Sequence, residues 1–136
     1  MDNKSKLFLS TILIGIVGTA TGCQQDEWNQ LISKGKKEAE IGQYELAKAD
    51  FTAAMLLVDK PGGDQSRLME SLSILAKQDE QLYQSVEAET LWRRALAIAQ
   101  AEGNNGKVQA ANILWQLSWT LDSQNRKSES LKTSWQ

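Results

Sequence analysis

Residues 87–98, Glu-Ala-Glu-Thr-Leu-Trp-Arg-Arg-Ala-Leu-Ala-Ile, contain the pattern that decides the fold. Small and aromatic side chains recur there and just beyond at steps of four, three and four, at Ala88, Trp92, Ala95 and Ala99. The same steps occur 41 residues earlier, at Ala47, Phe51, Ala54 and Val58. Such steps place side chains on one face of an α-helix. The stretch therefore predicts a helix that buries one face, and its recurrence predicts a repeated unit.

The segments that precede these two helices also match each other. Leucine-rich positions recur 42 residues apart, as Leu72, Leu75, Ala76 and Asp79 and then as Leu114, Leu117, Ser118 and Leu121. A more polar copy lies 41 residues before the first set, at Leu31, Lys34, Gly35 and Glu38. The intervening residues are good helix formers, and no segment alternates as a strand does. The sequence predicts an all-α fold of three helix pairs, with helices at 26–41 and 44–59, 66–80 and 83–101, and 107–124 and 127–136.

The amino-terminal residues have the pattern of a secretory signal peptide. Lys4 and Lys6 precede a nearly apolar run at residues 7–19. This run is shorter than the roughly 20 residues that a membrane-spanning helix needs, although an uncleaved anchor is the alternative. It ends at Ala20-Thr21-Gly22-Cys23, which resembles the bacterial lipobox.

The lipobox resemblance implies a lipoprotein. Residues 1–22 are then a signal peptide, and Cys23 carries the lipid, including acyl chains such as palmitate. Residues 23–27 are a short tether, and residues 28–136 form the repeat domain. In enterobacterial lipoproteins, an Asp directly after the lipid-bearing cysteine marks retention in the inner membrane. This chain has Gln24 at that position, so the same rule predicts that the protein is located on the periplasmic face of the outer membrane.

The amino-acid composition argues against a catalytic or metal-binding function. The 136 residues include no histidine, which is the commonest general base and metal ligand. The single cysteine is assigned to lipid, and carboxylates such as Glu87 and Glu89 are interpreted as solvated helix faces. The loop Gly103-Asn104-Asn105-Gly106 lacks the Lys of a phosphate-binding loop. With 15 basic and 17 acidic residues and no basic block, we expect no enzyme, metal, cofactor, nucleic acid or small-molecule substrate.

The repeated pattern resembles the tetratricopeptide repeat. The first copy matches its small and large positions at Gly35, Gly42, Tyr44, Ala47, Phe51 and Ala54. Residues 87–98 are similar to the longer variety found in kinesin light chains and many bacterial proteins. Tyr83 stands where that family has a turn glycine, so a turn shifted by a residue or two is expected there. The resemblance implies a short solenoid of about three stacked antiparallel helix pairs.

In that family the first helix of each pair lines a groove that holds a peptide or a partner helix. Carried over to this chain, the groove contains Lys36, Lys77, Asn112, Trp115, Trp119 and Asp122. Trp115 and Trp119 lie one turn apart, and aromatic anchors often dominate binding. The alternative is that these two indoles pack against the last helix or a neighbouring copy. Trp92 instead occupies the packing position that Phe51 holds in the first copy.

These features predict a lipid-anchored, non-catalytic adaptor of the bacterial cell envelope. Its groove is expected to bind a protein partner. The alternative is an obligate structural subunit of an envelope complex, in which the repeat faces form a permanent interface.

Overall fold

The computed structural model describes residues 26–124. The predicted signal peptide, Cys23, Gln24 and the predicted last helix at 127–136 lie outside the described residues. Within the described part the chain is all-α, as predicted, and contains no strand. The helices are residues 26–40, α2 (Tyr44–Val58), α3 (Gln65–Gln81), α4 (Ser85–Ala101), a 3-10 turn η1 (Gly103–Gly106) and α5 (Lys107–Ser123). Each boundary lies within two residues of its prediction.

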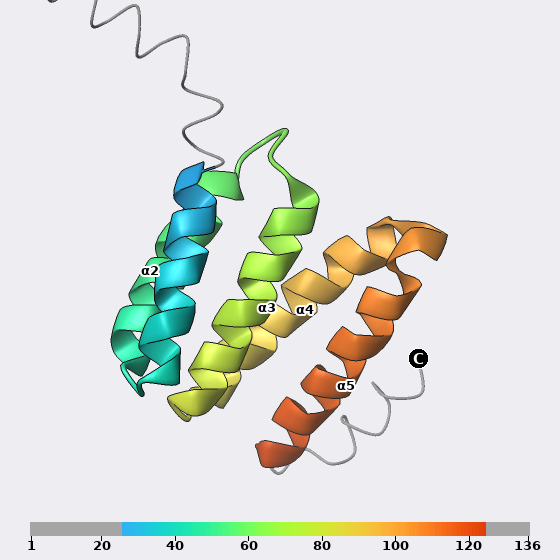
Figure 1. Cartoon of the computed structure of the whole chain (residues 1–136). Helices are drawn as coiled ribbons and strands as arrows, with labels where there is room; N and C mark the ends of the chain where they lie inside the picture. The colour runs from blue at the N-terminus through green and yellow to red at the C-terminus, as the bar shows by residue number, and fades with distance from the viewer. Residues whose placement is uncertain (1–25, 125–136) are drawn as a thin grey trace, which may run out of the picture.

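Neighbouring helices in the chain are neighbours in space. Figure 1 shows consecutive helices running in opposite directions, from the first helix and α2 at one side to α5 at the other. α3 packs between α2 and α4, and α4 packs between α3 and α5. Because each connection is short, each helix can bury its apolar face against the one before it. Among residues 26–124, none of the helices combines the length and apolarity needed to cross a bilayer.

The two matching faces of α2 and α4 form the centre of the core. All eight of their predicted positions are buried: Ala47, Phe51, Ala54, Val58, Ala88, Trp92, Ala95 and Ala99. Close approach of the first helix to α2 depends on Gly35, since a methyl group there would lie 2.5 Å from Cε1 of Phe51. Small residues thus set the spacing between helices, and the aromatic rings fill the space beyond them.

The first helix is the polar copy that the sequence indicates. Of its repeat positions Leu31, Lys34, Gly35 and Glu38, Gly35 is buried and Leu31 packs against the core partly buried, whereas Lys34 is exposed. Trp28 and Ile32 also enter the core. The Trp28 indole N–H donates to the Ser71 hydroxyl of α3 at 3.0 Å, and the Arg67 guanidinium lies 4.9 Å from the centre of the ring. Burial of these larger apolar side chains, which stand outside the repeated set of positions, stabilises the packing of this helix.

The turn between α3 and α4 keeps its place in the repeat, so the expected shift does not occur. Tyr83 has a φ of 59°, and Gly42 has a φ of 80° in the corresponding earlier turn. Tyr83 thus adopts the left-handed conformation that usually requires glycine, while its side chain is 94% exposed.

Replacement of Tyr83 by glycine is therefore expected to stabilise the fold. The left-handed conformation costs a non-glycine residue about 1 kcal/mol, and the exposed ring offers little packing in return. Urea denaturation followed by circular dichroism measures the gain. The matched control is Gly42→Ala, which should lose a similar amount. A destabilised Tyr83→Gly variant would show that the ring makes contacts that matter to the fold.

Candidate partner-binding groove

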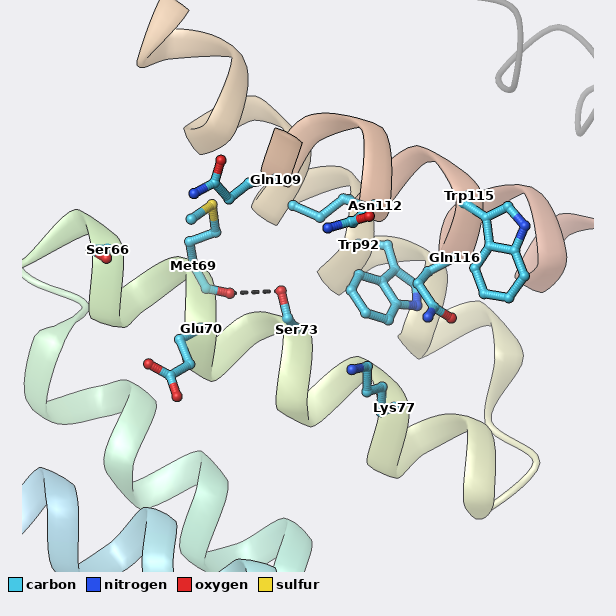
Figure 2. A pocket seen from close by; sticks show the side chains of 11 residues that line it. Ser66, Met69, Glu70, Ser73, Lys77, Trp92, Gln109, Asn112, Trp115 and Gln116 are labelled. Atoms are coloured by element: carbon cyan, nitrogen blue, oxygen red, sulfur yellow. Dashed lines mark hydrogen bonds between the residues drawn. The ribbon is translucent and has the colours of Figure 1, made fainter. Parts of the chain in front are cut away.

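An open groove of about 580 Å³ runs between α3 and α5. Figure 2 shows Trp92 of α4 between the side chains contributed by α3 and those contributed by α5. The lining residues are Ser66, Met69, Glu70, Ser73, Lys77, Trp92, Gln109, Asn112, Ile113, Trp115 and Gln116. On each of α3 and α5, most of these residues have another lining residue three or four positions away, so each helix presents one face to the groove.

The carboxylate of Glu80 accepts hydrogen bonds from two neighbouring helices, one of them from Trp92, which lines the groove. Trp92 is 1% exposed, and its indole N–H donates to Oε1 of Glu80 at 3.0 Å. The Thr120 hydroxyl of α5 donates to the same oxygen. Glu80, near the end of α3, therefore connects α3 with α4 and α5. The burial of Trp92 confirms the packing role predicted for it.

Most of the predicted groove residues come together in the structure. Lys77, Asn112 and Trp115 line the groove. Trp119 and Asp122 line a smaller cavity of about 160 Å³, which shares Trp115 with the groove and also includes Ser118. Lys36 is exposed on the first helix and lines neither cavity.

The two indoles of α5 lie at the surface. Trp115 and Trp119 are each 65% exposed, so neither is packed into the core that residues 26–124 form. Large aromatic side chains that remain this accessible, on one helix face and beside a groove, are typical of binding surfaces.

The polar groups that α5 contributes to the groove are amides. Gln109, Asn112 and Gln116 share one face of α5, and each amide offers both donors and an acceptor. Lys77 lies on the opposite wall, two helical turns after Glu70. Within the described part of the chain, no acidic side chain pairs with Lys77. The Ser73 hydroxyl is occupied, since it donates to the Met69 carbonyl at 2.8 Å.

Sequence reasoning missed four of the lining residues that matter here. Gln109 and Gln116 stand three and four residues from Asn112, so the spacing of the helix would have found them. Met69 and Trp92 reach the groove only because α3, α4 and α5 meet there. In the described residues no three acidic or cysteine side chains lie close enough together to hold a metal ion.

No protein-family model matches this chain, and no curated protein matches it.

Proposed function

We propose that this chain is a lipid-anchored, non-catalytic adaptor of the bacterial cell envelope that binds a protein partner in the α3–α5 groove. The observation that carries the proposal is the groove itself, with the exposed Trp115 on one wall and Lys77 on the other. Trp119, equally exposed, lines the smaller cavity that shares Trp115 with the groove. Cys23 is the proposed site of lipid attachment. The periplasmic face of the outer membrane is the proposed location.

A tetratricopeptide-like solenoid is the proposed architecture. α2 begins at Tyr44 and α4 at Ser85, which is the 41-residue interval of the sequence repeat. The left-handed turn residues Gly42 and Tyr83 differ by the same interval. These equal displacements support stacked copies of one helix pair, which bury their apolar faces against their neighbours.

A protein segment fits the groove better than a small molecule does. Small-molecule sites enclose most of their ligand, whereas this groove is open to solvent. The α5 amides can pair with the N–H and C=O groups of a peptide backbone. Trp115 offers exposed apolar surface for a side chain, and Lys77 offers a cation for a carboxylate.

Photocrosslinking in membranes tests the proposal. A photoreactive residue at position 116 of the full chain is expected to form a discrete adduct with one partner. Trp115→Ala should reduce that adduct strongly, because loss of an aromatic anchor costs about 2 kcal/mol of binding or more. Cys23→Ser should release the chain from the membrane fraction.

The matched control is a photoreactive residue at Val86, which is 65% exposed and lies outside the groove. An adduct of equal yield from both positions would refute specific binding in the groove. Aggregation or degradation of the Cys23→Ser chain without its partner would favour the obligate-subunit alternative.

A further inference from the structure

The two walls of the α3–α5 groove differ in charge. On α3, Glu70 and Lys77 both line the groove, and both are exposed. Within residues 26–124, neither of them forms an ion pair. On α5 the polar lining groups are the neutral amides Gln109, Asn112 and Gln116. One wall therefore presents a separated negative and positive charge, and the other presents uncharged donors and acceptors.

The charges and the amides cover the same length of the groove. Glu70 and Lys77 stand seven residues apart, and so do Gln109 and Gln116. Seven residues of helix rise about 10.5 Å. Because consecutive helices run in opposite directions, α3 and α5 run in the same direction and their two rows lie side by side (Figure 1). A partner in the groove thus meets both rows at once.

The amide row favours an extended partner over a helical one. A helix pairs its backbone N–H and C=O groups internally, so its backbone gives the α5 amides no partners. An extended segment leaves those groups free, and the three amides can donate to them and accept from them. Since polar groups that are covered without a partner oppose binding, the groove fits an extended segment better.

The charged row selects the spacing of the partner's side chains. To meet Glu70 and Lys77 together, two partner side chains need to point to the same wall about 10.5 Å apart. In a polyproline II segment every third side chain lies on one face, and three residues rise about 9.3 Å. In a β-strand the side chains of one face are two or four residues apart, about 7 or 13 Å, which fits less well.

We infer, on the basis of the proposed function, that the groove selects an extended partner segment with a basic and an acidic side chain about three residues apart. The basic side chain contacts Glu70, and the acidic side chain contacts Lys77. The backbone between them lies against the α5 amides. A segment with two like charges, or with the pair in the reverse order, places a charge against a like charge of the groove and is rejected.

Selection from a random peptide library displayed on phage tests this specificity. The full chain in detergent micelles is the bait, and the Trp115→Ala chain removes peptides that bind elsewhere. The enriched peptides are expected to share a basic and an acidic residue about three positions apart, in one fixed order along the peptide.

A charge exchange provides the decisive comparison. Glu70→Lys with Lys77→Glu keeps the net charge but reverses the row, so it should enrich peptides with the opposite order of charges. The matched control is Lys37→Glu with Glu40→Lys, which exchanges two exposed charges of the first helix outside the groove and should enrich the original order. Circular dichroism should show the same helix content in both exchanged chains.

Each contact can then be assigned with one selected peptide. Replacing its basic residue by glutamine should weaken binding to the original chain about twofold to fivefold, and should leave binding to Glu70→Gln unchanged. Replacing its acidic residue should give the same result with Lys77→Gln. Equal losses for all of these chains would contradict the assigned contacts.

The outcomes separate this inference from the proposed function. Peptides that depend on Trp115 but lack the charge pair, or keep their order after the charge exchange, would overturn the inference and leave partner binding in the groove intact. The charge exchange should also lower the membrane adduct from position 116, and an undiminished adduct would overturn the inference in the same way. Absence of both Trp115-dependent peptides and a Trp115-dependent adduct would overturn the proposed function as well.

Discussion

Replacement of Trp92 by alanine is expected to lower the free energy of unfolding by about 3–5 kcal/mol, the range for truncating a large buried aromatic side chain. Trp92 is 1% exposed and fills the space beneath the α3–α5 groove. Its loss leaves a cavity where three helices meet. It also removes the indole N–H that donates to Glu80. Urea denaturation followed by circular dichroism measures the change.

Two control variants separate the loss of the hydrogen bond from the loss of buried aromatic volume. Trp92→Phe keeps an aromatic ring but removes the N–H, and is expected to cost about 2 kcal/mol, the value for a hydrogen bond to a charged group. Trp115→Ala truncates an indole that is 65% exposed and is expected to cost about 0.5 kcal/mol or less. If the two alanine variants lost equal stability, Trp115 would belong to the core and would not be available to a partner.

Lys48→Met is expected to lower the free energy of unfolding by about 3 kcal/mol or more, because it leaves a buried carboxylate without its cation. Asp79 of α3 is 2% exposed. Nζ of Lys48 in α2 lies 2.7 Å from its Oδ1, which accepts no well-aligned hydrogen bond among the described residues. The ammonium group therefore compensates the charge at this oxygen. It also donates to the Gln84 side chain.

A double variant distinguishes the ion pair from simple loss of packing. Leu121 occupies the place of Asp79 in the third copy of the repeat and is fully buried. Lys48→Met combined with Asp79→Leu is therefore expected to recover most of the stability, since apolar groups often replace buried ion pairs without loss. Urea denaturation of both single variants and the double variant gives the coupling energy. Equal, additive losses would contradict a specific interaction between the two side chains.

The candidate site was only partly predictable. The repeat register correctly placed three residues on the groove side. Lys77 lies on α3, and Asn112 and Trp115 lie on α5, at least 35 residues later in the chain. Lys36 has the same register but remains outside, because it lies on the first helix, whereas the groove is lined by α3, α4 and α5. The role of Glu80 as the link between three helices had no sequence signal, since its partners Trp92 and Thr120 lie on different helices.

The sequence by itself determined the helices and the buried faces of α2 and α4. Helical geometry is local, so residues three and four apart share a face whatever surrounds them. Only the tertiary structure decided how the first helix is rotated, where the groove opens, and that Trp92 is enclosed while Trp115 is exposed. Those outcomes depend on contacts between helices distant in the chain, where side-chain volume and hydrogen-bond partners compete for the same space. The residue pattern predicts which side chains share a helix face, and the packing of the helices determines which of those faces are buried.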